Sequence, residues 1–253
     1  MCIICNGESL KNLKELIVCK KVSKIPELPQ SLTHLYCRNC PLLTTFPELP
    51  RSLKWFDCGF CLLLTTLPEL PQSLEYFRCY NCPLLTTLPE LPQSLEELHC
   101  GDCLLLTTLP ELPQSLKDLN CRICPITTLP ELPQSLTYLD CAKCHLLTTL
   151  PELPQSLETL LCFNCPLLTT LPELPQSLTH LDCHNCPSLR YLPELPHSLI
   201  YLNCNDCPLL TITKLPQSLK KLIYSGLSLS VTIPTIPTTV AIPTTVAYKL
   251  QTH

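Results

Sequence analysis

The chain has 253 residues, of which 45% are hydrophobic and 15% are charged, and its formal net charge is −4 at pH 7. A charged fraction this far below the usual quarter indicates that much of the chain faces a core, which excludes a disordered chain. The slightly acidic balance offers no basic surface for phosphate backbones, so we expect no nucleic-acid partner.

Residues 1–24 form an irregular lead-in. Residues 1–8 contain neither a basic leader nor a long apolar run, so they do not resemble a secretory signal, and we expect a cytoplasmic location. Leu13, Leu16 and Val18 echo the apolar spacing of the segments that follow, although no Pro-rich stretch precedes them. We therefore predict an N-terminal capping unit over residues 1–24.

From Ile25 to Leu227 the chain repeats one unit with a period of 21 residues, and residues 88–108 are a representative copy. The period shortens to 20 residues after Cys124, so the extra residue of the longer units must lie in a tolerant loop. A short period is typical of a solenoid, in which each unit buries its apolar face only against its neighbours. We therefore predict one solenoid domain over residues 25–227, with nine Cys-x-x-Cys units and a degenerate C-terminal unit.

Each unit contains two segments with opposite backbone preferences. The segment Leu-x-x-Leu-x-Cys-x-x-Cys alternates apolar and variable residues, as at Leu98, His99 and Cys100, which predicts one short half-buried strand. The segment Leu-Pro-Glu-Leu-Pro-Gln-Ser has two prolines that fix φ and exclude a helix, so it should be extended and close to polyproline II. The fold class that follows is a repeat solenoid, a horseshoe or superhelix with a parallel concave β-sheet and an extended convex side without helices.

The unit over residues 219–227 keeps the strand spacing but has Tyr224 and Leu227 in place of the two cysteines, so we predict a C-terminal cap. Residues 228–253 form a low-complexity tail rich in Pro and Thr, whose composition favours extended chain. The uncharged stretch from Leu222 to Tyr248 is long enough to cross a bilayer. Its prolines and threonines argue against a membrane span, and we expect none.

The array resembles leucine-rich repeats, because Leu32, Leu35, Cys37, Cys40 and Leu42 fall on successive framework positions of that repeat. Its Leu-Pro-Glu-Leu-Pro-x-Ser-Leu phrase is similar to the short-repeat subclass found in bacterial effectors that are delivered into animal cells, and similar arrays occur in giant viruses of amoebae. The resemblance implies a solenoid that binds other proteins on its concave sheet. It also implies a host-cell cytoplasmic location if the chain is viral or an effector.

The resemblance does not extend to catalysis. Effector ligases join their repeats to a large domain with a nucleophilic cysteine, which the 26 residues after Leu227 cannot hold. The chain also has no Gly-rich phosphate loop, because its four glycines lie far apart in the sequence. We therefore expect a protein that is not an enzyme and uses no cofactor.

Nine Cys-x-x-Cys pairs occur between residues 37 and 207, and neighbouring pairs are separated by 17 residues or, once, by 16, which matches the nominal spacing of a zinc site. The repeat offers another explanation, in which both cysteines are apolar core positions. The degenerate units favour the core, because the same positions hold Tyr224 near one end and Leu16 and Cys19 near the other. We predict a core ladder without metal. A metal-binding or thiol-buffering protein is the alternative. Equivalent cysteines of neighbouring strands are also close enough to form disulfides.

Specificity should reside at the variable positions beside each inward residue, because strand alternation sends them to the concave surface. In the N-terminal third these positions are aromatic and basic, and Tyr, Trp and Arg contribute most to protein interfaces. We predict an unidentified protein as the partner, bound around Trp55, Tyr76 and Arg78; the alternative is an ordinary exposed face with scattered aromatic residues. The predicted partner-binding residues are Tyr36, Arg38, Trp55, Asp57, Tyr76, Arg78, Tyr80, His99 and Tyr138.

Two further patterns have structural explanations. His180, Asp182 and His184 share a strand face, but neighbours at two-residue steps lie about 7 Å apart, which is long for a metal or acid–base site. The serine of each Gln-Ser-Leu phrase falls in the turn before a strand, where its hydroxyl can satisfy backbone groups.

Overall fold

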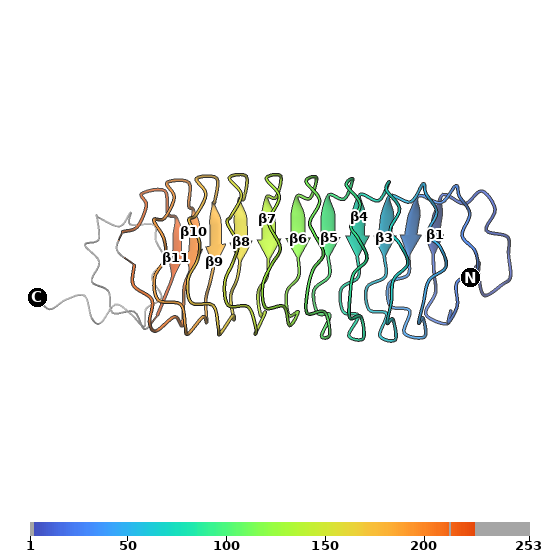
Figure 1. The fold of residues 1–253 in the computed structure, drawn as a ribbon, viewed down its shortest axis with the longest axis horizontal. Coiled ribbons are helices and arrows are strands. Elements are labelled where there is room, and N and C mark those ends of the chain that lie inside the picture. Colours follow the sequence, from blue (N-terminus) through green and yellow to red (C-terminus); the bar gives the residue numbers. More distant parts are fainter. Residues whose placement is uncertain (1–2, 213, 226–253) are drawn as a thin grey trace, which may run out of the picture.

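Eleven three-residue strands form one parallel sheet in the computed structural model, which describes residues 3–212 and 214–225 (Figure 1). The strands follow one another in the sheet in sequence order. The predicted tail, residues 228–253, lies outside the described residues. The strands are β1 Glu15–Ile17, β2 His34–Tyr36, β3 Trp55–Asp57, β4 Tyr76–Arg78, β5 Glu97–His99, β6 Asp118–Asn120, β7 Tyr138–Asp140, β8 Thr159–Leu161, β9 His180–Asp182, β10 Tyr201–Asn203 and β11 Lys221–Ile223.

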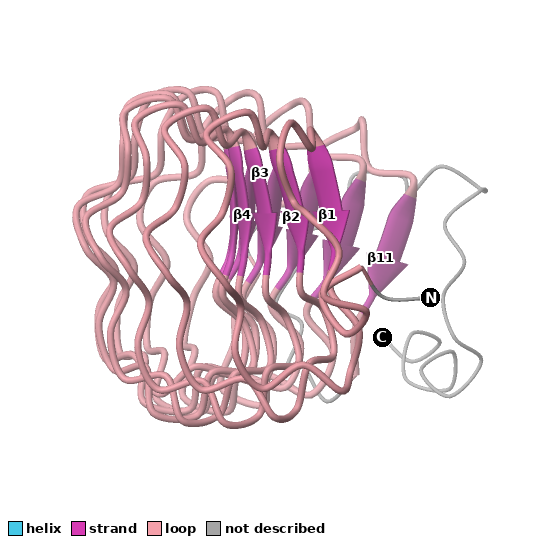
Figure 2. Ribbon diagram, turned by 90° about the vertical axis from the view of Figure 1, so that its right-hand side faces the viewer, coloured by secondary structure: helices cyan, strands magenta, loops and turns pink. Residues whose placement is uncertain are grey.

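The sheet occupies one side of the solenoid, and the chain returns along the other side without regular secondary structure (Figure 2). Residues 3–212 and 214–225 contain no helix, and hence none that is long and apolar enough to cross a membrane. The two prolines of each return segment explain this, since each removes a backbone donor and fixes φ. The structure confirms the predicted solenoid with a parallel sheet and a helix-free opposite side.

The central residue of each strand packs into the core. From β2 to β10 it is a Leu or Phe whose side chain is fully buried, and Phe56 and Phe77 stack in neighbouring strands with ring centroids 5.5 Å apart. Because side chains alternate along a strand, the first and third residues point away from this core. The outer face of the sheet, here called the sheet face, therefore carries two side chains per repeat.

The first turn has a different register from the one that the sequence suggested. Leu16 pairs with Leu35 at the strand centre, so Val18 rather than Leu16 occupies the first cysteine position. Cys19 occupies the second position, because the Val22 amide donates to the Cys19 carbonyl just as Leu43 does to Cys40. The prediction for Leu16 was wrong because the first turn is shorter than the later ones. Its conclusion still holds, since Val18 and, at the other end, Tyr224 fill the position and are buried.

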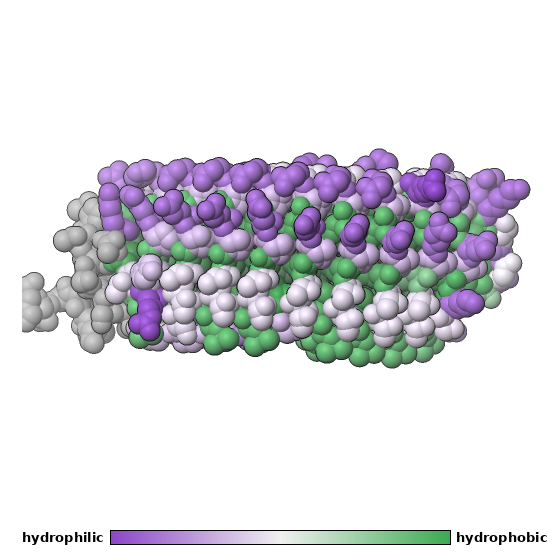
Figure 3. Space-filling model, viewed as in Figure 1, coloured by the Kyte–Doolittle hydropathy of each residue, from purple (hydrophilic) through white to green (hydrophobic). Residues whose placement is uncertain are grey.

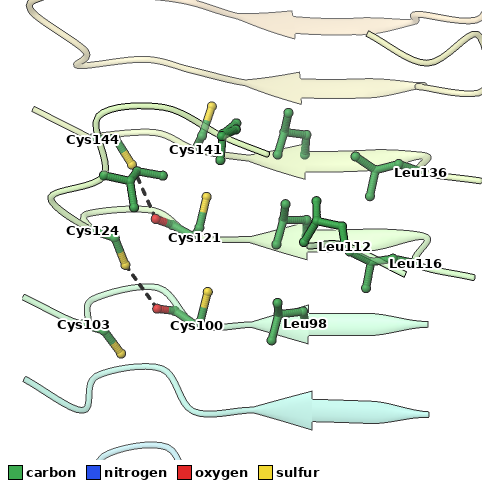
Figure 4. Close-up of a cluster of buried hydrophobic side chains, with 14 of the residues drawn as sticks. Leu98, Cys100, Cys103, Leu112, Leu116, Cys121, Cys124, Leu136, Cys141 and Cys144 are labelled. Carbon is green, nitrogen blue, oxygen red and sulfur yellow. Dashed lines mark hydrogen bonds between the residues drawn. The ribbon is translucent and has the colours of Figure 1, made fainter. Parts of the chain in front are cut away.

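The paired cysteines form a ladder through the core. All eighteen are fully buried, and the second thiol of each repeat from Cys61 to Cys207 donates to the carbonyl oxygen of the first cysteine one repeat earlier. These Sγ–O distances are 3.2 to 3.4 Å. Figure 4 shows the bonds from Cys124 to Cys100 and from Cys144 to Cys121. The thiols thus fill the core and also satisfy backbone acceptors there.

The serines form a second ladder beside the sheet. From Ser52 to Ser218, each Oγ donates to a leucine carbonyl of the preceding repeat at 2.6 to 2.8 Å. Ser31 makes the same bond to Leu13. These bonds confirm a structural role for the serine of the Gln-Ser-Leu phrase.

The side opposite the sheet separates polar and apolar side chains into long rows (Figure 3). After the second cysteine, a 21-residue unit has an exposed leucine followed by a buried one, as with Leu84 at 39% exposed and Leu85 at 0%. The 20-residue unit goes directly to the buried Ile126, and the pairing of β6 with β7 is kept. The residue that the short unit lacks is therefore an exposed one, as predicted.

Candidate protein-binding surface on the sheet face

Eight of the nine predicted partner-binding residues are exposed or half-buried on the sheet face and in the turns that follow the strands. The exception is Asp57, which is 6% exposed and whose Oδ1 accepts a hydrogen bond of 2.9 Å from the Gly59 amide. Its side chain holds the turn and is buried, so Asp57 does not belong to the contact surface for which the sequence predicted it. The same bond, from an amide two residues on, is accepted by Asn120, Asp140, Asp182 and Asn203.

Three aromatic rings cross neighbouring strands on the sheet face. Ring centroids are 6.2 Å apart for Tyr36 and Trp55, and 4.7 Å apart for Trp55 and Tyr76, which stack at 27°. The Arg78 guanidinium carbon lies 4.8 Å from the centroid of Trp55, within range of a cation–π contact. We call Tyr36, Trp55, Tyr76 and Arg78 the aromatic row. The parallel pairing of β2, β3 and β4 brings these four side chains together.

The Trp55 indole nitrogen is buried and has no hydrogen-bond partner in the described part of the chain. An unsatisfied buried donor costs about 1–3 kcal/mol, which makes it unusual in a folded protein. Burial also raises the pKa of Tyr36 above 10, so its hydroxyl is neutral at physiological pH. The aromatic row therefore has one cation, Arg78, and neutral rings.

A second cluster lies at the ends of the same strands. The Arg38 guanidinium carbon is 5.4 Å from the ring centroids of both Phe60 and Tyr80, and the two rings meet edge to face at 5.2 Å. A Cβ added to Gly59 would lie 2.7 Å from the Tyr80 ring, so only glycine allows this packing. The sequence prediction missed Phe60. Phe60 lies in the Cys-x-x-Cys turn, after the strand has ended, so the alternation of buried and exposed side chains along the strand does not predict its exposure.

A charge network adjoins the aromatic row. Arg78 Nε lies 2.5 Å from Glu97 Oε1, and this hydrogen bond raises the pKa of Arg78, which stays cationic. His99 lies between two carboxylates, with Nδ1 3.4 Å from Glu97 Oε1 and Nε2 3.2 Å from Asp118 Oδ1. Glu97 thus links Arg78 of β4 to His99 of β5, and His99 continues the network to Asp118 of β6. The guanidinium is held in place over Trp55 by this bond.

Glu97, His99 and Asp118 are also the one group of His, Cys, Asp or Glu side chains in residues 3–212 and 214–225 whose ligand atoms are close enough to share an ion. A cation there would have to compete with Arg78 for Glu97. No cysteine belongs to such a group among these residues. The geometry therefore lends no support to a zinc site between neighbouring cysteine pairs.

An open groove of about 520 Å³ runs between the Arg38 cluster and the charge network. Its walls come from four adjacent repeats and combine aromatic, amide and guanidinium groups. Arg122 in its wall pairs with Asp102, with Nε and Oδ2 3.3 Å apart. The groove is lined by Phe60, Arg78, Tyr80, Asn81, His99, Gly101, Asp102, Asn120 and Arg122.

The remaining candidates lie apart from the aromatic row. Tyr138 is on β7, three strands from β4, and burial raises the pKa of its hydroxyl. Of the three residues on β9 and in its turn, Asp182 and His184 meet at 2.6 Å, whereas His180 stacks on Tyr201 at 5.9 Å. The structure does not bring His180, Asp182 and His184 together as one site.

Comparisons with known proteins agree with the repeat fold. A leucine-rich-repeat family model matches residues 31–53 and 135–157. The chain is similar to YopM, a leucine-rich effector protein from Yersinia pestis, with 29% identity over 91% of this chain and 83% of YopM and a TM-score of 0.51. It is also similar to the giant-virus protein CroV588, a circular leucine-rich-repeat structure, with 25% identity over 91% of this chain and 43% of CroV588 and a TM-score of 0.55. Curated protein sequences give no match. The matches confirm the resemblance to leucine-rich repeats of bacterial effectors and giant viruses.

Proposed function

We propose that this leucine-rich-repeat chain is a non-enzymatic scaffold that binds a partner protein through the sheet face, with the aromatic row at the centre of the contact. The observation that carries the proposal is the row of three rings across three strands, in which Trp55 stacks on Tyr76 and Tyr36 lies tilted against Trp55. Arg78 lies over the middle ring. Interface energy concentrates in a few Trp, Tyr and Arg side chains near the centre of a contact.

The side chains of the row are already ordered before any partner binds. The rings contact one another, and Glu97 fixes Arg78, so association immobilises few additional rotamers. An acceptor on the partner that reached the Trp55 indole nitrogen would remove the cost of its unsatisfied donor. Similarity to YopM, described as a leucine-rich effector protein, supports a binding role in a host-cell cytoplasm.

The test uses a partner captured by cross-linking in the native cell and then purified. Trp55 is the only tryptophan of the chain, so its emission reports directly on the aromatic row, and we expect a spectral shift when the partner is added. The double variant Trp55→Ala/Tyr76→Ala should weaken binding at least about tenfold in calorimetry. Circular dichroism should remain unchanged, because both side chains are half-buried on the outer face.

A matched pair on the same face supplies the control. His180 and Tyr201 stack at 5.9 Å on β9 and β10, and Lys221 lies over Tyr201, but they are far from the aromatic row. His180→Ala/Tyr201→Ala should leave affinity unchanged. Equal losses in both double variants, or none in either, would place the contact elsewhere.

A further inference from the structure

The ladder of thiols ends at Cys19. In the later repeats the second cysteine donates to a strand-end carbonyl of the preceding repeat, but residues 3–14 contain no strand. Cys19 holds the same position in the first turn, and its Sγ instead lies 3.3 Å from Sγ of Cys5 in the lead-in. The two residues are 14 apart in the sequence. The end of the repeat array thus replaces a thiol–carbonyl contact by a thiol–thiol contact.

These two thiols differ from the ladder in access. Cys5 is exposed and Cys19 is half-buried, whereas the eighteen paired cysteines are fully buried. Burial also raises the pKa of many ladder thiols, to about 12 for Cys61 and Cys204, so these carry little thiolate at neutral pH. Thiolate is the form that attacks a disulfide. An oxidant in solution therefore meets Cys5 and Cys19 long before it meets the ladder.

We propose that Cys5 and Cys19 form a reversible disulfide that fastens the lead-in to the first turn of the solenoid. A disulfide has an S–S length of about 2.05 Å, so the two sulfurs must approach by roughly 1.2 Å. Cys5 lies in a short loop closed by bonds of 3.1 Å from the Gly7 and Glu8 amides to the Ile4 and Ile3 carbonyls. This loop can shift without disturbing a strand.

The oxidant is a low-molecular-weight disulfide such as oxidised glutathione. One cysteine loses its proton and attacks a glutathione sulfur, the glutathione S–S bond breaks, and one glutathione thiolate leaves. The second cysteine, as thiolate, then attacks the protein sulfur of this mixed disulfide and releases the second glutathione. The two protons lost by the cysteines end on the two glutathione thiols. The protein loses two electrons and two protons, and one oxidised glutathione becomes two reduced molecules.

The bond would act where a repeat array is weakest. Terminal units have a neighbour on one side only and open before the centre does. Ile3 and Ile4 are partly buried and pack against the hydrophobic core. Closing a loop between Cys5 and Cys19 ties these covering residues to the first turn, so oxidation would stabilise the end that β1 forms.

The test is peptide mapping of the full chain equilibrated with mixtures of reduced and oxidised glutathione. Lys11, Lys14 and Lys20 allow trypsin to release residues 1–11 and 15–20 separately. We expect these two peptides to appear linked, lighter by two hydrogen atoms than their sum, and to separate on reduction. Hydrogen exchange of the Gly7 and Glu8 amides should slow in the oxidised protein.

Serine variants identify the atoms involved. Cys19→Ser should abolish the link and leave the Gly7 and Glu8 exchange rates independent of the glutathione ratio. Cys2→Ser should leave the link intact, which separates Cys5 from the other cysteine of the same peptide. The proposal is overturned if Cys2→Ser removes the link, or if the two peptides carry separate glutathione adducts at every ratio.

Discussion

The residue before the second cysteine of every pair has a left-handed backbone, with φ between 53° and 64°. Six of the nine such residues are Asn or Asp, which tolerate this conformation because their short polar side chains bond locally. Phe60, Ile123 and Lys143 are the exceptions. A β-branched residue is the least suited to positive φ, so Ile123 is the strained position of the array.

Ile123→Asn should stabilise the protein by about 1 kcal/mol, because Asn tolerates the left-handed conformation and a β-branched residue does not. Ile123 is half-buried, and the core loses little from its removal. Urea unfolding would measure the change. The reverse substitution at the equivalent Asn81, Asn81→Ile, should destabilise by a similar amount. An Ile123→Asn variant less stable than wild type would show that Ile123 contributes more by packing than its backbone costs.

Asp140 makes stability depend on pH. Burial raises the pKa of this carboxyl in the folded state above 3.8, while the hydrogen bond from the Ala142 amide opposes the shift. The folded state therefore binds the proton more tightly than the unfolded chain, and that stability is lost as pH rises through the raised pKa. Asn holds the same turn at Asn120 and Asn203. Asp140→Asn should therefore raise the Tm at pH 7, with a gain that shrinks in acid.

The control for this pH dependence is Asp206→Asn, at an exposed turn position where Asn also fits the positive φ. Thermal unfolding at a series of pH values should give a Tm difference that changes with pH for Asp140→Asn alone. Parallel curves for Asp140→Asn and wild type would mean that the carboxyl ionises as freely in the fold as in the unfolded chain.

At the residue scale, the variable strand positions predicted the aromatic row. They did not predict that Asp57, Asp140 and Asp182 accept a hydrogen bond from the amide two residues later. Trp55, Tyr76 and Arg78 meet because identical spacing in successive repeats guarantees that equivalent positions adjoin. Asp57 and Arg78 hold the same position in their strands, so periodicity predicts that both side chains point outward. It cannot distinguish an outward carboxylate from one that folds back onto the amide two residues later. The tendency of Asp and Asn to bond that amide was the signal that could have separated them.

At the scale of the element, one strand and its turn are specified several times over. The buried leucine, the two cysteines and the serine each bond or pack against a neighbouring repeat, so the strand positions follow from the period alone. The first turn is the exception, because the sequence predicted Leu16 at a cysteine position and it lies at the centre of a strand. The turn after β1 is shorter than its counterparts, and no proline phrase precedes it to fix the register of Leu16.

The cysteine ladder allows a prediction for one of its thiol–carbonyl bonds. Cys103→Ala should destabilise by about 1–2 kcal/mol, because it leaves a cavity and removes the 3.2 Å bond to the Cys79 carbonyl. Cys103→Ser keeps a donor and should recover part of this loss. Cys100→Ala removes packing alone and should cost less. Chemical unfolding of the three variants measures the order.

Metal analysis of the same samples, reduced and purified, separates the ladder from the alternative of a metal-binding protein. Zinc content should be unchanged between wild type and each variant. About one zinc per two cysteine pairs in the wild type, lost in Cys103→Ala, would assign the pairs to metal. Thiols that react only after denaturation favour the ladder, since burial blocks reagents.

At the scale of the whole molecule, each repeat contacts only its two neighbours in the sheet. Stability is then close to a sum of repeat and interface terms, and the binding surface is a local product of three strands rather than of the whole solenoid. The aromatic row needs β2, β3 and β4, and the strands beyond the groove support it without touching it.

Two deletions of 21 residues test this division. Removing residues 163–183 joins Cys162 to His184 and takes out β9, so that β8 can pair with β10 in the same register. The thiols of Cys186 and Cys207 then again face the carbonyl of a first cysteine one repeat earlier. Removing residues 38–58 joins Cys37 to Gly59 in the same way but takes out Trp55 with β3. Both shortened chains should fold, because every ladder is rebuilt, and both should lose a similar increment of stability. The first should bind the partner as the full chain does, and the second should lose it. Calorimetry with the captured partner that shows equal affinity for the two shortened chains would move the contact away from the aromatic row.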